Sequence, residues 1–393
     1  MRGKVIVVLT FLLLPFTSAS AGTEKVLYTF TGGLDGAQPY QAGVIFDQAG
    51  NLYGVTQYGG VYGQGTVFKL TPSPDGTWTE TVLYSFAGGS DGGIPQGGLA
   101  TDGAGNFYGT TAFGGENNDD CGTLFVVWQG IEFAVLHTFN DLTGDACQPE
   151  SDLIVDEDTI IGTTAYGGGP SEPGTVFVKE PGEYDAWPCK RTRFGSYPNG
   201  LSPFAGSIYV TANTGGGKAW GTVFEFSNPM KTKHTFTPKS KEGDSPVGNL
   251  ATQVNPDGVG IMYGTTSAGG ASDCGAVYQL RQKQWGKWAI SLLHSFSLYP
   301  IDGCSPWGGV VLDAAGNLYG TTSYGGTGNA GTIFKLTPGA KNKWTYTVLY
   351  TFTGSTDGNS PTGSLLLDSA GNIYGTTNYG GAYNQGVVYE VTP

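Results

Sequence analysis

Histidine, cysteine and charged residues are scarce in this chain. Its 393 residues include three histidines and five cysteines, and charged side chains make up 13% of the total. A Ser-His-Asp or Cys-His arrangement needs a histidine. However, His137, His234 and His294 each lie two residues before the phenylalanine of a recurring segment, where other copies carry tyrosine. We interpret this position as a packing site, and we predict no catalytic residues.

Positive charge is scarcer than negative charge. The chain has 19 Lys and Arg against 32 Asp and Glu, a formal net charge of −13 at pH 7. A surface of this sign repels phosphates, so we expect no nucleic-acid partner and favour neutral or cationic ones. The cysteines form no CxxC pair, no histidine pair accompanies them, and no DxDxDG run occurs. We therefore predict neither a metal site nor a cofactor.

Only one long apolar run is present, and it lies at the N-terminus. A basic start precedes the apolar residues Val5 to Phe16, and the small residues 18–21 follow. This order is typical of a secretory signal peptide, with cleavage expected after Ala21, whereas the alternative is an uncleaved membrane anchor. We expect a secreted, extracellular mature protein that is a monomer, with no membrane span after signal cleavage.

Glycine and aromatic residues are abundant, and they occur in a repeat. Glycine accounts for 67 residues, which suits many short strands joined by tight turns. The phrase GNLYGTTSYGGTGNAGTIFKLTP, residues 316–338, recurs along the chain. Its core tyrosine has equivalents between 48 and 56 residues apart at Tyr53, Tyr108, Ile161, Tyr209, Tyr263, Tyr319 and Tyr374. Seven copies at such a period indicate one repeat architecture.

Each copy contains four strand-like segments, which we name a to d. In the sixth copy they are residues 308–313, 317–322, 331–337 and 347–352. A DxAGN turn joins a to b in the best copies, a glycine-rich loop joins b to c, and no segment shows a sustained helical period. The pattern predicts an all-β fold: a seven-bladed β-propeller with four antiparallel strands per blade, forming one domain of residues 22–393.

The two ends of the mature chain complement each other. Residues 25–30 (KVLYTF) match strand d, whereas residues 386–393 (GVVYEVTP) match strand c. We predict that the N-terminal strand closes the last blade and covers its open edge.

The cysteines fall in matching places of two copies. Cys121 and Cys274 each precede strand c, whereas Cys147 and Cys304 lie in the loops that follow strand d. Because both kinds of loop should lie on one rim, we predict the disulfides Cys121–Cys147 and Cys274–Cys304 and leave Cys189 free.

The same rim should carry the candidate ligand-binding residues. Aspartates recur in the d–a loops, including Asp145 and Asp244, and aromatic residues recur in the b–c loops. Rigid aromatic faces beside carboxylates suit sugars or short polar ligands. The candidates are Asp35, Asp91, Asp302, Asp357, Tyr58, Phe113, Tyr166, Trp220, Tyr324 and Tyr379. The alternative is that both series only maintain the loop conformation, as we expect for the a–b turn aspartates Asp47, Asp102, Asp313 and Asp368.

Two further features remain open. The divergent fourth segment of the third copy carries Lys190, Arg191 and Arg193, and Lys218 lies in the next b–c loop. These residues either hold an anionic partner or place charge on an edge strand.

The phrase GNLYGTTxxGG…GTVFKLTP…VLYxF resembles the repeat of the Gloeo/Verruco (GloVer) family of exported bacterial proteins. The likeness covers practically the whole mature chain and is strongest near Tyr53, Tyr319 and Tyr374. The resemblance implies a secreted or surface-anchored bacterial propeller without an established activity. The order of the segments also resembles the NHL propeller repeat, in agreement with strands a to d.

These observations favour a non-enzymatic, secreted propeller that binds an extracellular glycan or protein through the rim of d–a and b–c loops. One alternative is a carbohydrate-active enzyme, a lyase or hydrolase, that uses the rim carboxylates. The other is a structural component of the cell surface.

Overall fold

The computed structural model describes residues 22–116, 120–140, 145–167, 174–188, 196–216, 220–238, 241–283, 286–297 and 302–393. The expected signal peptide, Cys189 and the basic residues of segment 190–193 lie outside these ranges, as does Lys218. The predictions made for them therefore stay predictions.

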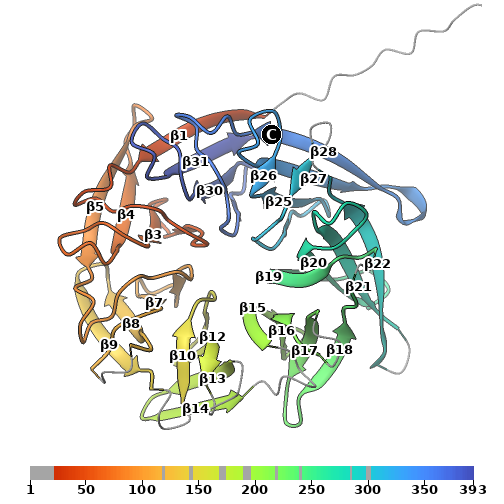
Figure 1. The fold of residues 1–393 in the computed structure, drawn as a ribbon, viewed down its shortest axis with the longest axis horizontal. Coiled ribbons are helices and arrows are strands. Elements are labelled where there is room, and N and C mark those ends of the chain that lie inside the picture. Colours follow the sequence, from red (N-terminus) through yellow and green to blue (C-terminus); the bar gives the residue numbers. More distant parts are fainter. Residues whose placement is uncertain are drawn as a thin grey trace, which may run out of the picture.

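Seven antiparallel sheets surround a central axis (Figure 1). Strand a lies nearest the axis and strand d forms the outer edge. Blade 1 consists of β2 (Ile45–Phe46), β3 (Leu52–Thr56), β4 (Thr66–Pro72) and β5 (Trp78–Ser85). Blade 2 consists of β6 (Ala100–Thr101), β7 (Phe107–Thr111), β8 (Thr123–Trp128) and β9 (Glu132–Thr138). In blade 3, strand a is split into β10 (Ala146–Pro149) and β11 (Ile154–Asp156), followed by β12 (Thr159–Gly167), β13 (Thr175–Glu180) and β14 (Glu183–Pro188).

The remaining blades follow the same order. Blade 4 consists of β15 (Ser196–Phe204), β16 (Ser207–Thr214), β17 (Thr222–Phe226) and β18 (Lys231–Thr235). Blade 5 consists of β19 (Asp244–Val254), β20 (Gly260–Ala268), β21 (Ala276–Gln282) and β22 (Trp288–Ser295). Blade 6 consists of β24 (Val311–Leu312), β25 (Leu318–Thr322), β27 (Thr332–Pro338) and β28 (Trp344–Thr351), with the short pair β23 (Gly303–Cys304) and β26 (Tyr324–Gly325) and the 3-10 turn Ala340–Asn342. Blade 7 consists of β29 (Leu366–Leu367), β30 (Ile373–Thr377), β31 (Val387–Thr392) and β1 (Thr23–Thr29). The prediction of an all-β, seven-bladed propeller is confirmed.

The N-terminal strand closes the ring, as predicted. β1 pairs antiparallel with β31, from Thr23 opposite Thr392 to Thr29 opposite Val387. Figure 1 shows the two strands side by side at the edge of blade 7. This pairing occupies hydrogen-bonding groups that would otherwise form an open sheet edge.

Aromatic contacts between neighbouring blades build the core. The phenylalanine that follows strand d in one blade meets, edge to face, an aromatic ring on strand c of the next blade. Described pairs are Phe30–Phe68, Phe86–Phe125, Phe139–Phe177, Phe236–Tyr278, Phe296–Phe334 and Phe352–Tyr389, with ring centroids 5.1 to 5.2 Å apart. The strand c ring also covers the glycine of the YGTT motif, because a Cβ on Gly54 would lie 2.6 Å from the Phe68 ring. The motif needs its glycine because the core ring occupies that space.

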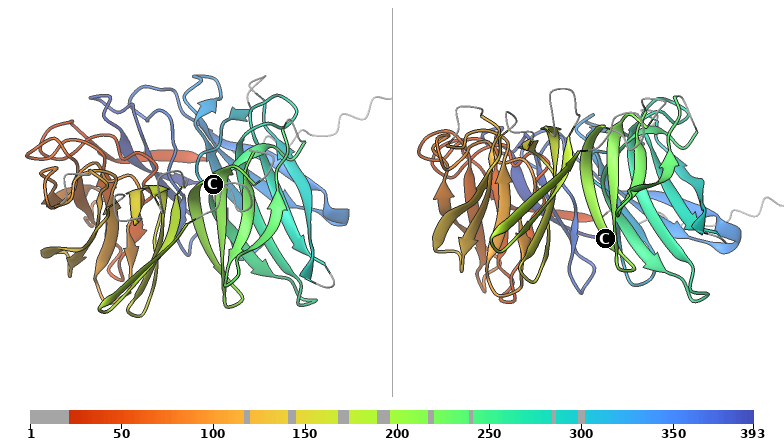
Figure 2. Two further views of the ribbon diagram at one scale, coloured as in Figure 1. Left: turned by 60° about the horizontal axis from the view of Figure 1, so that its bottom comes forward. Right: turned by 90° about the horizontal axis from the view of Figure 1, so that it is seen from below.

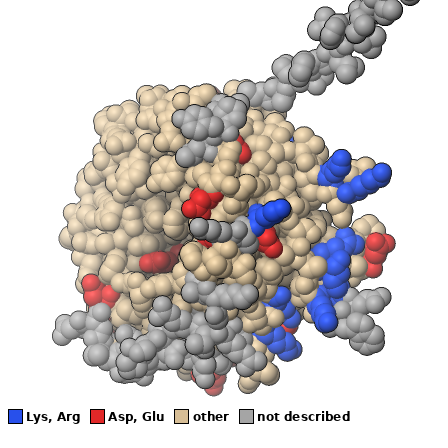
Figure 3. Space-filling view, turned by 45° about the vertical axis from the view of Figure 1, so that its right-hand side comes forward, with Lys and Arg blue, Asp and Glu red and all other residues tan. Residues whose placement is uncertain are grey.

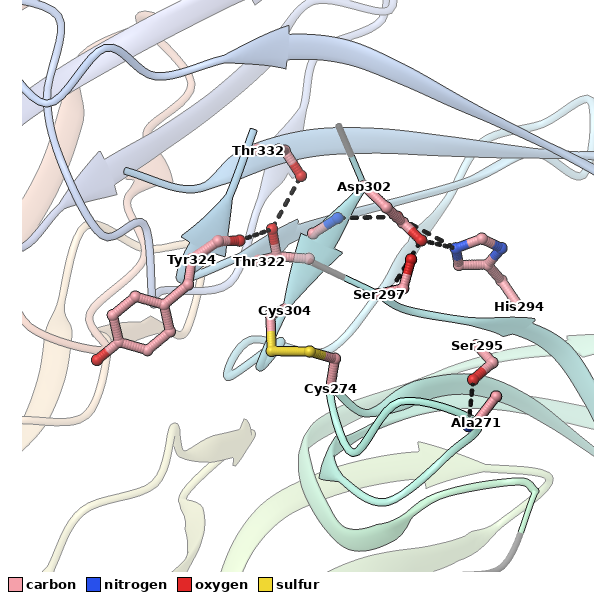
Figure 4. A network of polar contacts seen from close by, with 11 residues as sticks. Ala271, Cys274, His294, Ser295, Ser297, Asp302, Cys304, Thr322, Tyr324 and Thr332 are labelled. Carbon is pink, nitrogen blue, oxygen red and sulfur yellow. Dashed lines mark hydrogen bonds and ion pairs between the residues drawn. A yellow bond between two sulfur atoms is a disulfide. The ribbon is translucent and has the colours of Figure 1, made fainter. Parts of the chain in front are cut away.

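The two threonines of the motif make different contacts. In blades 3, 4, 5 and 7 the first donates a hydrogen bond to a backbone carbonyl of the next blade, as Thr265 does to Gly308 at 2.9 Å. The second joins strand b to strand c, as Thr322 does with Thr332 at 2.9 Å (Figure 4). The repeated residues thus hold blades together and hold strands within a blade.

Strand a is shorter than the sequence suggested. In blade 6 it covers only Val311–Leu312, although the segment was expected to begin at residue 308. Its preceding glycines approach the neighbouring blade, and a Cβ on Gly309 would lie 2.1 Å from the carbonyl oxygen of Asn249. The backbone there packs along the axis and does not continue the ladder.

Both predicted disulfides are present. Cys121 bonds to Cys147, and Cys274 bonds to Cys304, as Figure 4 shows for the second pair. Each joins a b–c loop to the d–a loop that follows, so these two kinds of loop share one face of the disc, which we call the loop face (Figure 2). Within the described ranges, no helix is long and apolar enough to cross a membrane.

Candidate functional site

The d–a loop aspartates fasten the loop to the strand before it. Around Asp302, Nε2 of His294 lies 3.1 Å from Oδ2, and the backbone N–H groups of Ser297 and Gly303 donate to the carboxylate (Figure 4). The same contact links Tyr28 to Asp35, Tyr84 to Asp91, His137 to Asp145 and Tyr350 to Asp357. The histidines alternate with tyrosine because both side chains can donate a hydrogen bond to this aspartate.

One member of the aspartate series was assigned to the wrong residue. Glu242 lies four residues before Pro246, as Asp302 lies four before Pro306, so Glu242 and not Asp244 is the equivalent. Burial lowers the pKa of His234, and the charge of Glu242 opposes that shift. Asp244 is instead a buried residue at the start of β19. The exchange of aspartate for glutamate hid the correct alignment.

The a–b aspartates cap the hairpin turn. Asp313 accepts hydrogen bonds from the backbone N–H groups of Ala315 and Asn317, from the Asn317 amide and from the Tyr319 hydroxyl. Burial raises the pKa of Asp313, but these hydrogen bonds outweigh burial and leave the pKa below its usual value. The DxAGNLY phrase is therefore a single hydrogen-bonded unit, as the turn interpretation expected.

The hydrogen bonds that Asp313 accepts predict a pH-dependent loss of stability. Because the pKa of Asp313 is lowered in the folded protein, its contribution is present above the ordinary value of 3.8 and is lost as the pH falls through the folded pKa. We expect Asp313→Asn to lower the free energy of unfolding by about 1 kcal/mol at pH 7. The difference from the native protein should vanish near pH 2. Urea unfolding at both pH values measures it.

Asp257 provides the control for this measurement. It is exposed in the corresponding turn of blade 5, where Asn255 takes over the contact to the backbone. Asp257→Asn should leave the unfolding midpoint unchanged at both pH values. A destabilisation by Asp313→Asn that is equal at both pH values would contradict a stabilising role of the Asp313 carboxylate.

The aromatic candidates form a crescent on the loop face. Five occupy one repeat position beside a d–a loop, over blades 6, 7, 1, 2 and 3 in order around the ring: Tyr324, Tyr379, Tyr58, Phe113 and Tyr166. We call them the aromatic crescent. Its four tyrosines are 39 to 50% exposed. Blades 4 and 5 carry Thr214 and Ala268 at this position, so the crescent has an open side.

Trp220 lies apart from the crescent position. It is 40% exposed and belongs to the b–c loop of blade 4, where its carbonyl accepts a hydrogen bond from Ser245. It therefore stands on the open side, where the crescent has no aromatic residue.

A pocket of about 230 Å³ opens on the propeller axis, and sequence reasoning missed it. Its lining residues come from six of the seven blades: Gln41, Glu150, Ser151, Asp152, Ala165, Tyr197, Pro198, Asn199, Asn213, Gly248, Asn249, Trp307, Gly308, Thr362 and Ser364. We call it the axial pocket. Amides, hydroxyls, two carboxyl groups and two aromatic rings thus surround a volume that suits a small polar ligand.

Asp152 forms the floor of the axial pocket by joining several blades. Its Oδ1 accepts the Gly98 N–H at 2.8 Å, and its Oδ2 accepts the Asn249 amide at 2.8 Å and the Ser364 hydroxyl at 3.3 Å. The Asn249 oxygen in turn accepts the Leu201 N–H at 2.9 Å. Residues of blades 2, 3, 4, 5 and 7 therefore meet on the axis.

The sequence contained a signal for this floor. Asp152 directly precedes the first apolar residue of strand a in its copy. The residues at this position in the seven copies are Gly43, Gly98, Asp152, Gly200, Asn249, Gly309 and Ser364. Glycine is the rule and three polar residues depart from it. Only the closed ring of blades shows that the side chains of Asp152, Asn249 and Ser364 lie next to one another.

Glu150 lies in the wall of the axial pocket without a partner. It is partly buried and has no hydrogen bond or ion pair in the described part of the chain, and burial raises its pKa. Burial also raises the pKa of Tyr40, with further contributions from Glu150, Tyr379 and Tyr324. These contributions place Tyr40 close to the wall carboxyl and to two tyrosines of the crescent.

Aromatic contact continues from the pocket wall to the crescent. The Tyr197 ring lines the pocket and meets Tyr166 edge to face, with centroids 5.2 Å apart. Trp307 supplies a second aromatic wall from blade 6. The axial pocket and the crescent therefore form one connected surface.

Charge is distributed unevenly around the ring. Residues 231–343 contain ten Lys and Arg against six Asp and Glu, whereas the rest of residues 22–393 contains seven against 26. Figure 3 shows basic side chains gathered toward one edge of the molecule, at the right of the view. Blade 3, which supplies Glu150 and Asp152, belongs to the acidic part.

Fold and site together define a seven-bladed β-propeller, closed by its N-terminal strand, with a polar and aromatic pocket on its axis. The chain belongs to the Gloeobacter/Verrucomicrobia repeat family, whose model matches residues 14–187 and 196–393. The resemblance seen in the sequence is thereby confirmed. No curated protein matches the chain.

Two solved structures are similar to this chain at low identity. A protein from Lactobacillus plantarum is 17% identical with a TM-score of 0.52, and the match covers 83% of this chain and 88% of that chain. A proposed gluconolactonase is 12% identical with a TM-score of 0.41, covering 96% of this chain and 93% of that chain. At 17% identity the likeness to the Lactobacillus plantarum protein concerns the fold alone.

Proposed function

We propose that this protein is a secreted, non-enzymatic module that binds a short extracellular glycan in the axial pocket and along the aromatic crescent. The observation that carries the proposal is the pocket itself, in which aromatic walls stand beside amide, hydroxyl and carboxyl groups. Sugar rings present an apolar face and many hydroxyls, so they need both kinds of surface. The two disulfides support an oxidising, extracellular location.

Binding fits these residues better than catalysis by the rim carboxylates. Asp35, Asp91, Asp302 and Asp357 all accept hydrogen bonds from the strand before their loop, so at least one oxygen of each carboxylate already has a partner. The enzyme alternative would instead require that Asp302→Asn or Asp357→Asn abolishes turnover of a glycan while the fold persists.

A glycan array probed with aromatic variants tests the proposal. We expect Trp307→Ala to weaken binding of any captured oligosaccharide at least about tenfold, and Tyr324→Ala or Tyr379→Ala to weaken it less, because stacking area is lost. The matched control is Trp128→Ala. That tryptophan is 39% exposed at the end of β8, away from the pocket lining. Equal loss in both tryptophan variants, or no captured glycan, would contradict the proposal.

A further inference from the structure

Glu150 is an ionisable side chain at a position where the fold requires none. The equivalent residues in the other copies are Gln41, Gln96, Pro198, Val247, Trp307 and Thr362, none of which is charged. The propeller therefore accepts neutral side chains here in every other blade. A carboxylate removed from water without a hydrogen-bond donor costs free energy, so its presence calls for a partner from outside the chain.

Among the residues that the structure describes, no group in the pocket neutralises Glu150. The lining contains no lysine or arginine, and the second carboxyl group, Asp152, already accepts hydrogen bonds from Gly98, Asn249 and Ser364. Burial raises the pKa of Asp152, so the cation-attracting group of the pocket is the carboxyl of Glu150, which has no counter-charge. The aromatic walls, Trp307 and Tyr197, add faces that favour a cationic group nearby.

We infer that the ligand of the axial pocket carries a protonated amine that pairs with Glu150. The sugar units of a glucosamine oligosaccharide carry such an amine. This inference rests on the proposed function and adds the ligand class to it. The hydroxyls of such a sugar can use Asn199 and Asn213, and its ring can stack on Trp307. An ammonium group supplies three donors to a carboxylate that has none.

A divalent metal ion fits these residues less well than an amine. Calcium takes six to eight oxygen ligands, usually with several carboxylates. Among the described residues, no group of three or more His, Cys, Asp and Glu side chains could hold a metal ion. Because the oxygens of Asp152 are occupied by hydrogen bonds, Glu150 is the one carboxylate of the pocket lining with free oxygens.

Titration calorimetry at pH 7 with three disaccharides tests the inference: the β-1,4 dimer of glucosamine, its N-acetylated form and cellobiose. The native protein should bind the amine at least about tenfold more tightly than the two neutral sugars, because only the amine can pair with the carboxylate. Glu150→Gln should bind the amine at least about tenfold more weakly and lose the preference. The control Glu132→Gln, exposed on β9, should keep native affinities for all three.

The outcomes separate this inference from the proposed function. Equal affinity for amine and neutral sugars would overturn the pairing with Glu150 and leave glycan binding intact, as would a preference that survives in Glu150→Gln. Binding of Ca²⁺ that competes with the sugars would overturn it in favour of a metal. Failure of all three sugars to bind would overturn the inference together with the proposed function.

Discussion

Deletion of residues 23–31 is expected to lower the melting temperature by more than about 10 °C. β1 supplies the whole outer strand of blade 7, and its removal would expose β31 along six paired residues. It would also remove Leu27 and Phe30, which are buried in the cluster around Phe68. Loss of one buried phenylalanine alone costs about 3–5 kcal/mol, and each 1 kcal/mol shifts the melting temperature by about 2–4 °C or less in a domain of this size.

The control for this deletion restores the strand from outside. A synthetic peptide of residues 22–31 should raise the melting temperature of the truncated chain, because the vacant edge of β31 can pair with it. Leu34→Ala should leave the melt unchanged, since that side chain is 70% exposed just beyond the strand. A truncated chain that melts within about 3 °C of the full chain would show that ring closure contributes little.

The fold was predictable because each repeat reports on the same local structure. Four copies of DxAGN and four of YGTT fix turns and strands independently, and the strand d at the start of the chain (KVLYTF) and the strand c at its end (GVVYEVTP) fix the closure. The disulfides followed from the same logic, since a b–c loop and the next d–a loop must share a face in any propeller. Short-range patterns sufficed because the long-range contacts repeat with them.

The site was less predictable for the same reason. Repeated residues such as Asp302 and Tyr350 attract attention through repetition, yet their contacts hold loops and strands in place. The axial pocket is built from residues that differ from the repeat, such as Glu150 and Asp152, and each blade contributes a different side chain. Which of these residues come into contact depends on the closure of the ring, and no local sequence pattern encodes those contacts.

Asp152→Ala is expected to lower the free energy of unfolding by about 2–3 kcal/mol and to weaken ligand binding in the axial pocket. The change removes three hydrogen bonds that reach blades 2, 5 and 7. Each hydrogen bond contributes about 0.5–1.5 kcal/mol, and water entering through the pocket can replace part of the loss. Urea unfolding measures the stability, and calorimetry with the glucosamine dimer measures the binding.

Two comparisons show whether the loss arises on the axis. Asp156→Ala, in β11 on the same inner strand but exposed, should change stability by less than about 0.5 kcal/mol. In a double-mutant cycle, Asp152→Ala and Asn249→Ala should be less than additive, because both remove the same 2.8 Å contact. Strict additivity would mean that the two residues act separately. The axial contacts would then stabilise individual blades, and Asp152 would not be the link that holds blades on opposite sides of the pocket together.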